Sequence, residues 1–490
     1  MILIKVEALN IYDSVYAAQD LSAIRGASLS LLEIPTRLEE WLKHEYHGVL
    51  KITAGASKAT FGVDDSCGDP KTIEQQVQEW LNKECPYATI GVACAKMEAG
   101  AKFFAADETL LSRIRNKQMV SFSFAGLVHQ QGKGVCSLDR VRPAISDAIR
   151  RGEDSFPVCK EVYDLHEVGK ERKQAFLHEH AGLDNATYKY TWDFDSLATN
   201  EDAGSLNRKM AVFYADGNHF GSLLRDALSA QNSEGQLAGI KTFDDVLQAK
   251  RKEFLKRLLE AAIGPRWQTK TGERRIELLL WGGDELMIVV PAWCGWEVAE
   301  LFASVINEAS VRIGNRTIPL KHAMGLVFAH YKAPIHALAK LVSKLADDEA
   351  KEGLTPDGRI GRETSRLSYL ALESFDHVGE DLERFRLLQW PHEDARKGLV
   401  LSAEGGTLSK MRKTMASLKD NEFPRRKVYE AVLGLSRGED WDELKQKISP
   451  FVERNEWKDL LVSWQNATGG ERSSWYHLAE LWDYLAPDVK

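Results

Sequence analysis

Disulfide frameworks, long apolar runs and an excess of positive charge are all missing from this sequence. Its six cysteines are scattered over 490 residues, which excludes the disulfide scaffold of a small secreted protein and is typical of a reducing compartment. No segment approaches the apolar length of a membrane span, and the N-terminus, MILIKVEALN, has no basic stretch before a cleavage site. We therefore predict a soluble, cytoplasmic protein that does not contact a membrane.

The charge balance limits the kinds of partner. With 72 acidic and 64 basic residues the chain has a net charge of −8, so it is not a general electrostatic surface for nucleic acid. Any contact with RNA or DNA must be local. A chain of 490 residues with 44% hydrophobic composition can bury large cores and should form two to four domains.

One motif combines strong apolar patterning with adjacent acids. Residues 278–291 read LLLWGGDELMIVVP, and Gly-Gly between two runs of strand formers predicts a β-hairpin with Asp284 and Glu285 at its tip. Paired carboxylates beside such an apolar sheet are costly unless a cation compensates their charge. Mg²⁺ or Mn²⁺ is the natural candidate, because hard cations take carboxylate ligands. A solvated turn that merely favours Gly and Asp is the alternative.

A third acid ends a strand upstream of the hairpin. The strand predicted at 210–216 leads to Asp216, and a helix is predicted to begin near Asn218. Gly217 and Gly221 would let the backbone pass close to a ligand, and free amides at the helix start suit a triphosphate. The same residue types are also common in ordinary turns and helix caps.

The elements that follow have the order βαββαβ with additions. After the first strand we predict helical material at 218–262 and the hairpin strands within 276–291. A helix near 294–311, a strand at 320–329, a helix at 334–352 and a strand at RLSYLALESFD come next. In a ferredoxin-like arrangement the first strand lies beside the hairpin, so Asp216 would meet Asp284 and Glu285.

The pairing of YADGNHFG with a GGDE hairpin resembles the palm domain of the GGDEF and CRISPR polymerase group. This group comprises diguanylate cyclases and the large polymerase-like subunit of type III CRISPR effector complexes, and the second is the better match over most of the chain. The segment DLSAIRGASLSLLEIP is similar to the start of that subunit's first palm. GKERKQAFLHEHAG resembles the segment that links its middle region to its second palm.

An internal repeat supports a second palm. Residues 4–15 align on 212–223 without gaps, which places Ala8 where Asp216 stands. Residues 50–63 repeat the hairpin pattern, with Gly55, Ala56 and Ser57 in place of Gly283, Asp284 and Glu285. This alignment predicts that the first palm has lost its acids. Two unrelated αβ domains are the alternative.

We therefore predict an α+β chain with two ferredoxin-like (βαββαβ) palm domains. The expected divisions are a degenerate first palm at 1–130, a middle region at 131–205, a catalytic second palm at 206–384 and a helical C-terminal domain at 385–490. In the C-terminal helices Trp441, Trp457, Trp464 and Trp475 are either interface anchors or, as we favour, core residues.

The chain departs from the family in two places. Its middle region often carries a zinc ribbon, but here only Cys136, Asp139, Cys159 and His166 could form an irregular site. We favour a vestigial ribbon or free thiols over zinc. The family's large subunits commonly begin with an HD nuclease domain, and this sequence has no His-Asp dipeptide, so we expect no DNase activity.

The resemblance implies the roles of the site residues. Asp216, Asp284 and Glu285 would be catalytic, and together with Gly217 they would hold Mg²⁺ or Mn²⁺. A lysine of the 334–352 helix would reach the phosphates, with Lys344 and Lys351 both open. The nucleotide-binding set is Gly217, Asn218, Phe220, Gly221, Ser222, Gly282, Gly283, Lys344 and Lys351.

The implied function is a palm nucleotidyltransferase that joins nucleoside triphosphates into a cyclic oligonucleotide in antiviral defence, with ATP favoured over GTP as the substrate. Guide or target RNA and CRISPR-type subunits are the expected partners, through the C-terminal helices. Two alternatives stay open: a diguanylate cyclase-like dinucleotide synthase, and a catalytically idle scaffold that binds RNA or protein. The degenerate partner palm and the missing RxxD motif before the hairpin argue against the first. The three retained acids argue against the second, because unneeded buried carboxylates are costly.

Overall fold

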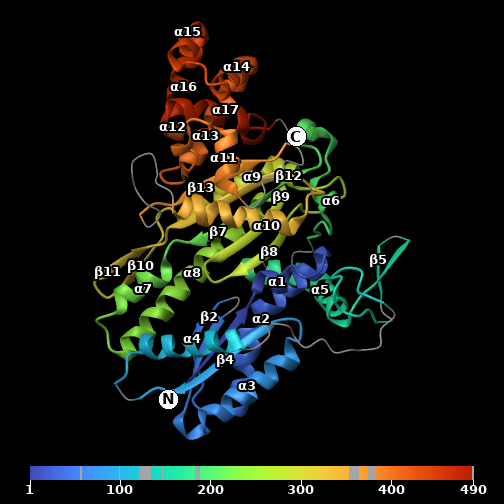
Figure 1. Cartoon of the computed structure of the whole chain (residues 1–490), viewed down its shortest axis with the longest axis vertical. Helices are drawn as coiled ribbons and strands as arrows, with labels where there is room; N and C mark the ends of the chain where they lie inside the picture. Colours follow the sequence, from blue (N-terminus) through green and yellow to red (C-terminus); the bar gives the residue numbers. More distant parts are fainter. Residues whose placement is uncertain are drawn as a thin grey trace.

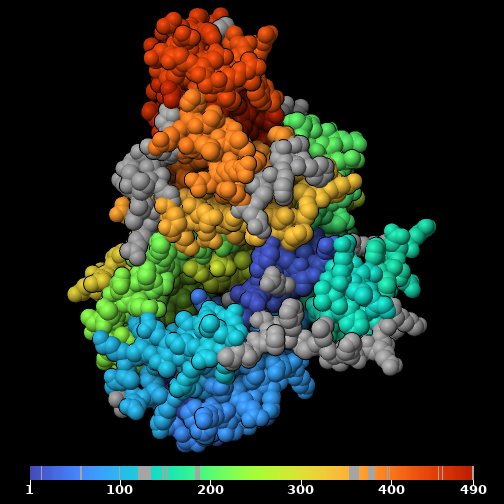
Figure 2. All heavy atoms as spheres, viewed as in Figure 1, coloured from blue at the N-terminus to red at the C-terminus, as the bar shows by residue number. Residues whose placement is uncertain are grey.

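The chain stacks its parts along one long axis (Figure 1). The computed structural model describes residues 1–490 except 56–57, 99, 121–133, 146–147, 152, 183–187, 353–362, 374–380 and 488–490. The N-terminal sheet lies at one end, a larger sheet in the middle and the C-terminal helices at the other end. The space-filling view (Figure 2) shows the same order, from blue through green and yellow to red.

The N-terminal part contains four strands and four helices. The strands are β1 (Ile2–Leu9), β2 (Leu50–Ala54), β3 (Lys58–Val63) and β4 (Thr89–Lys96), and the helices are α1 (Ile11–Val15), α2 (Leu21–Glu45), α3 (Pro70–Glu84) and α4 (Phe103–Val120). The sheet order is β2-β3-β1-β4 with antiparallel neighbours throughout. This succession and order are those of a ferredoxin-like unit.

The two faces of β1 enter different cores. Ile2, Ile4 and Val6 belong to the main core, whereas Leu3 and Leu9 belong to a second core. This alternation follows from the two-residue period of a strand. Both cores also include side chains of the second palm, so the two palms fold against each other.

The second palm has a larger sheet than the first. Its strands are β7 (Lys209–Gly217), β8 (Glu277–Gly282), β9 (Glu285–Pro291), β12 (His322–His330), β13 (Arg366–Ala371) and β14 (Leu401–Ser402), in the order β14-β13-β12-β7-β9-β8. The four strands β12-β7-β9-β8 repeat the order of the first sheet. β13 runs parallel to β12 and β14 antiparallel to β13, so the sheet has six strands rather than four. The last strand comes from a segment predicted to be helical.

Five helical segments and a short hairpin complete this palm. They are α7 (Phe220–Leu228), α8 (Ser233–Ala261), α9 (Ala292–Ile306), α10 (Ile335–Lys344), a π-helical segment (Leu345–Lys351), β10 (Ser310–Ile313) and β11 (Arg316–Pro319). The helical material predicted at 218–262 thus consists of two helices, α7 and α8. Asn232 caps α8 by accepting a hydrogen bond of 2.9 Å from the amide of Gly235.

The middle region consists of β5 (Ala148–Arg151), β6 (Asp154–Pro157), α5 (Lys160–Ala181) and α6 (Phe194–Ala198). Helix α5 lies along α2 (Figure 1). Two glycines make this contact possible. A Cβ on Gly26 would lie 1.9 Å from the carbonyl oxygen of Leu165, and one on Gly169 would lie 1.9 Å from that of Ser22. The helices therefore cross with their backbones in contact.

Replacing Gly169 by alanine is expected to destabilise the protein. The new methyl group has no room against the Ser22 carbonyl, and overpacking of this kind costs about 1–3 kcal/mol or more. Chemical denaturation monitored by circular dichroism measures the loss. Gly221→Ala is the matched control, because nothing lies within 4 Å of its Cβ position. Equal stability of both variants would contradict the close helix crossing.

A buried ionic cluster joins both palms and the middle region. Glu277 of β8 accepts two hydrogen bonds from Arg25 of α2, at 2.7 and 2.6 Å, and one of 2.8 Å from Lys173 of α5. Lys173 also donates to the carbonyl of Thr191 at 2.6 Å. All three charged side chains are at most 3% exposed. The strand that leads into the GGDE hairpin is thus fixed to two other parts of the chain.

The C-terminal part is helical, as predicted. It contains α11 (Leu382–Gln389), α12 (Glu393–Lys397), α13 (Thr407–Asp420), α14 (Arg425–Ser436), α15 (Trp441–Val452), α16 (Asn455–Thr468) and α17 (Glu471–Leu485). The four tryptophans predicted as core or interface residues are all buried, so the core prediction is confirmed. Among the residues described, no helix combines the length and apolar character needed to cross a membrane.

Candidate functional site

The GGDE hairpin and the end of β7 lie at the same edge of the second sheet. Gly282 pairs with Glu285, and Gly283 between them has a φ of 56°, which favours glycine. Ala215 of β7 pairs with Leu286 of β9. Asp216 is therefore the next residue of β7 alongside the hairpin. The structure thus brings together the three acids that sequence reasoning selected.

Gly217 allows this close approach. A Cβ at this position would lie 2.9 Å from the Cβ of Asp284 and 2.3 Å from the ring of Phe220. Any larger residue would push the end of β7 away from the hairpin. Gly221 has open space around it, so the first turn of α7 is accessible at this residue.

The acids repel one another in a partly enclosed site. Burial and the charge of Asp284 raise the pKa of Asp216 to about 6. Glu285 lies at the accessible rim, yet the surrounding protein together with Asp216 and Asp284 raises its pKa to about 7, against the opposing charge of Lys58. The cluster therefore has more negative charge than its neighbourhood compensates.

Lys351 is the lysine that contacts this cluster. Its ammonium group forms an ion pair with Asp216, and it lies 3.4 Å from Asp347, one turn earlier in the π-helical segment. Burial alone would lower the pKa of Lys351, but the two carboxylates raise it. Lys344 is the last residue of α10. π-Helical turns are frequent at functional sites, and this one carries Lys351 to Asp216.

Two predicted ligand side chains point into the protein. The ring of Phe220 is 4% exposed and packs edge to face on Phe243 and His322. The side-chain amide of Asn218 is buried and donates to the carbonyl of Thr364 at 3.3 Å. These residues support the turn from behind. Ser222 is exposed and donates to the carbonyl of His219 at 2.9 Å.

Three neighbouring carboxylates suit a hard cation, which prefers oxygen ligands. Their oxygens are not gathered around one point, however. Within the described part of the chain, the only group of three or more His, Cys, Asp or Glu side chains whose ligand atoms all lie within 4.8 Å of one another is Cys136, Asp139 and Cys159. The donor types of the acid cluster fit Mg²⁺ or Mn²⁺, and the Lys351 ammonium is the cation beside Asp216 in this arrangement.

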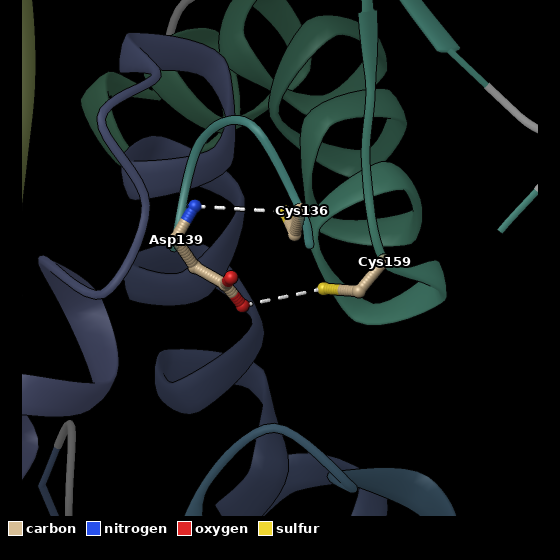
Figure 3. Close-up of side chains that lie close together, drawn as sticks. All are labelled: Cys136, Asp139 and Cys159. Carbon is tan, nitrogen blue, oxygen red and sulfur yellow. Dashed lines mark hydrogen bonds between the residues drawn. The ribbon is translucent and has the colours of Figure 1, made fainter. Parts of the chain in front are cut away.

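The cysteine group lies in the middle region (Figure 3). The single proton of the Cys159 thiol can go to Asp139, 3.4 Å away, or to Cys136, and this neighbouring thiol together with the amide of Asp139 lowers the pKa of Cys136 to about 6. Asp139 also forms a 2.8 Å ion pair with Arg142. His166 does not join them, because α5 directs it to Asp20 at 2.8 Å. The predicted four-residue set is thus reduced to three, and our preference for free thiols over zinc stays a prediction.

The second palm shares a cavity with the first. It has a volume of about 240 Å³ and lies between the GGDE hairpin and helices α1 and α2. The hairpin tips of the two palms touch, since a Cβ on Gly55 would lie 3.9 Å from the Cα of Gly283. Sequence reasoning missed the lining residues of the first palm and α10, because they follow no motif: Ile11, Tyr12, Val15, Tyr16, Ser28, Leu31, Lys58 and Ser343.

In the structure, the two copies of the internal repeat align one residue away from the predicted alignment. Asn10 and His219 occupy equivalent left-handed positions before α1 and α7. Glu7 of β1 is the register partner of Lys58 of β3. Asp216 has the corresponding place beside Glu285 in the second palm. The predicted equivalence of Ala8 and Asp216 is therefore wrong, because Ala8 faces the main core. The first palm keeps an acid, Glu7.

Glu7 and Asp216 each interact with a cation from the helical segment that follows the fourth strand of their palm. Arg115 of α4 donates to Glu7 at 2.8 Å, just as Lys351 forms an ion pair with Asp216 from the helical segment after the fourth strand. At the position of Glu285, by contrast, the first palm has Lys58. Ala56 and Ser57, predicted to replace the other hairpin residues, lie outside the described part of the chain.

The raised pKa values predict how pH and metal act on stability. A carboxyl group with a raised pKa in the folded state stabilises the fold at low pH, and that contribution is lost as pH rises through the folded pKa. For Asp216 and Glu285 the loss should fall between about pH 4 and pH 7. Mg²⁺ competes with those protons, so it should raise the melting temperature at about pH 8 by roughly 2–4 °C.

Thermal melts with EDTA or Mg²⁺, at about pH 5 and pH 8, measure this difference. Glu285→Gln is the matched variant, because it removes one charge and keeps the shape. It should melt higher than the unaltered protein in EDTA and gain less from Mg²⁺. A Mg²⁺ effect that is the same at both pH values, or unchanged in Glu285→Gln, would contradict metal binding by these acids.

Comparisons with known proteins match one segment of the chain to a protein family and the whole chain to a known fold. Residues 209–357 match the family described as Cas10/Cmr2, second palm domain. A search of curated proteins found no match. Among solved structures, the chain is similar to the Csm1-Csm4 cassette in complex with cA4, with a TM-score of 0.54 and 16% identity over 99% of this chain and 69% of the other.

Two further structures of that cassette show the same likeness. The complex with AMPPNP has a TM-score of 0.53 and 15% identity over 100% of this chain and 70% of the other. The complex with cA3 has a TM-score of 0.52 and 16% identity over 99% and 69%. Residues 209–357 therefore match the second palm domain of the Cas10/Cmr2 family, and the chain has the fold of its counterpart in the Csm1-Csm4 cassette.

Proposed function

We propose that the chain is a metal-dependent nucleotidyltransferase that joins nucleoside triphosphates, ATP foremost, into a cyclic oligonucleotide in CRISPR-type defence. The observation that carries this proposal is the acid cluster of the second palm, which faces a cavity shared with the first. The similar cassettes were solved with AMPPNP, cA3 and cA4. Those ligands support adenine nucleotides as the substrate class.

The acids and the neighbouring backbone would hold the cations. Asp216, Asp284 and Glu285 supply carboxylate oxygens, and the Asp216–Gly217 backbone adds a carbonyl. Divalent cations in such sites activate an attacking hydroxyl and neutralise charge on the transferred and departing phosphates. Lys351 would release Asp216 and turn to the phosphates, because its ammonium group already lies in the cluster.

The cavity suggests how a nucleotide lies. Its lining is largely apolar and aromatic, with Tyr16, Tyr214, Leu280 and Met287, and it also includes Asp284 and Glu285. A volume of about 240 Å³ is below the roughly 300–1,000 Å³ of typical ligand pockets. The base and ribose would therefore lie inside, with the phosphates at the rim. The accessible turn at Gly221 and Ser222 can approach the phosphates there.

Partner binding belongs to the same proposal. The related subunit lies in a Csm1-Csm4 cassette, and we propose CRISPR-type subunits and local RNA contacts for this chain too. The C-terminal helices remain the proposed contact region. Their tryptophans are buried, so the contact would use other residues.

The test is incubation of the full chain with Mg²⁺ or Mn²⁺ and each nucleoside triphosphate, singly and in pairs. Products are resolved by mass spectrometry, with and without added RNA and candidate subunits. A linked adenylate product supports the proposal, and its mass gives length and cyclisation. A guanylate product would favour the dinucleotide synthase, and no product under any condition would favour the idle scaffold.

A further inference from the structure

The π-helical segment before Glu352 carries charged side chains in two directions. Lys351, its last residue, forms the ion pair with Asp216 at the acid cluster. Glu349, two residues earlier, contacts Arg386 of α11 in the C-terminal part of the chain. Side chains two positions apart do not face each other on a helical segment. The segment therefore lies between the acid cluster and the C-terminal helices.

Arg386 binds Glu349 through two nitrogens of its guanidinium group. Nε donates to one carboxylate oxygen at 3.0 Å and Nη2 to the other at 3.1 Å. Nη2 also donates to the carbonyl of Tyr369 in β13 at 2.6 Å, and Ser368 of the same strand donates to Glu349. Arg386 is only 3% exposed. A buried bidentate pair has a defined geometry, so this contact fixes Glu349 against the sheet.

The end of α11 is attached in turn to the last helix. Gln389, the last residue of α11, and Trp390 after it donate to the same carboxylate oxygen of Glu480 in α17, at 2.6 and 3.0 Å. Trp390 is fully buried and its ring stacks on Tyr476 of α17. A continuous set of contacts thus runs from α17 through α11 to the segment that ends in Lys351.

We propose that Arg386 is a positioning residue for Lys351 and acts through Glu349. This inference rests on the proposed function, in which Lys351 turns from Asp216 to the phosphates. Arg386 fixes the backbone of the π-helical segment from behind, so that the Lys351 side chain alone moves between those two places. The C-terminal helices then contribute to the geometry of the site without touching the nucleotide.

The rival explanation is that Arg386 only joins the C-terminal part to the palm. A second pair of the same kind allows the comparison: Arg412 of α13 donates to Glu300 of α9 through Nε at 2.6 Å and Nη2 at 3.1 Å. This pair also joins a C-terminal helix to the second palm, but α9 carries none of the predicted site residues. Arg412→Met is therefore the matched control for Arg386→Met.

The first experiment measures how fast the Lys351 amine reacts with an acylating reagent, by mass spectrometry on the full chain. The Lys351 side chain is 20% exposed and paired with Asp216, so it should react slowly. Arg386→Met should speed the reaction roughly tenfold, because a hydrogen bond to a charged group is worth about that factor. Arg386→Lys, which keeps the charge, should have a smaller effect, and Arg412→Met should have none.

Lys173 is the reference for general unfolding, because it is 3% exposed in the buried cluster with Glu277. Its reaction should be equally slow in every variant. A matching rise at Lys173 and Lys351 in Arg386→Met would show that the whole protein opens, and it would overturn the positioning role. Equal rates for Lys351 in Arg386→Met and Arg412→Met would overturn it too.

Steady-state synthesis gives a second readout through a double-mutant cycle. Arg386→Met should reduce the rate of synthesis by roughly tenfold in the unaltered chain. In a chain that already has Lys351→Met it should change the rate little, because residues that act through one another have non-additive effects. Arg412→Met should leave the rate unchanged in both backgrounds. Additive effects of Arg386→Met and Lys351→Met would contradict the inference.

The inference and the proposed function fail in different ways. If the unaltered chain makes a product, and Arg386→Met changes neither its rate nor the reaction of Lys351, the inference alone is wrong. If the unaltered chain makes no product with any partner, the synthase proposal fails. The acylation rates still measure whether Arg386 holds Lys351 in place, since they need no synthesis.

Discussion

Asp284→Ala is expected to abolish synthesis of linked nucleotides, with a fall of roughly a thousandfold or more. The charge stabilisation that a bound metal supplies is worth several kcal/mol, and each 1.36 kcal/mol is about tenfold in rate. Asp284 stands at the hairpin tip, where its charge raises the pKa of both Asp216 and Glu285. Its loss removes a proposed metal ligand from the centre of the cluster.

The same substitution should leave the fold intact or slightly more stable. Removing one of three like charges relieves repulsion, and Asp284 is only partly buried. Product formation by mass spectrometry and thermal melting in EDTA measure the two effects. Asp348→Ala is the matched control, because Asp348 is an exposed acid of the π-helical segment. Synthesis by Asp284→Ala at more than about a tenth of the normal rate would contradict a metal-binding role.

Glu277→Ala is expected to destabilise the protein by about 3–5 kcal/mol. The substitution leaves Arg25 and Lys173 buried without the carboxylate that accepts their hydrogen bonds. Burial already lowers the pKa of Lys173 to about 8, even though Glu277 opposes this shift. Two uncompensated cations would then face each other between the palms.

This loss should also reduce synthesis, because β8 carries the hairpin and is fixed through Glu277. Chemical denaturation gives the free energy of unfolding, and limited proteolysis reports separation of the palms. Asp164→Ala removes one partner of the exposed pair with Lys160 and should leave both readouts unchanged. A Glu277→Ala protein as stable as Asp164→Ala would show that the buried cluster does not hold the palms together.

Local patterns in the sequence were sufficient for the fold class and the acids. The alternation of apolar runs around Gly-Gly gives the hairpin, and the run before Asp216 gives the neighbouring strand. Both signals arise within a few residues, so they need no knowledge of distant contacts. The helical C-terminal part and its buried tryptophans were predicted for the same reason.

The predictions that failed depended on residues far apart in the chain. The repeat was misaligned by one residue, and in a strand such a shift moves a side chain to the opposite face. Glu7, not Ala8, therefore matches Asp216. His166 contacts Asp20 and not the cysteines. The packing of α5 on α2 decides which face of α5 meets α2, and the spacing of the residues in the sequence does not show this. β14 joined the sheet because the edge of β13 offered unpaired backbone groups.

The sequence by itself determined that this protein has a palm with a GGDE hairpin, three acids in reach of one another and a second, altered copy of the same unit. Only the tertiary structure decided which lysines belong to the site. Lys351 reaches Asp216 across 135 positions, and Lys58 reaches the cavity from the other palm. Local periodicity records which face of a strand or helix is buried, whereas contacts between palms depend on how whole units pack, and no short pattern carries that information.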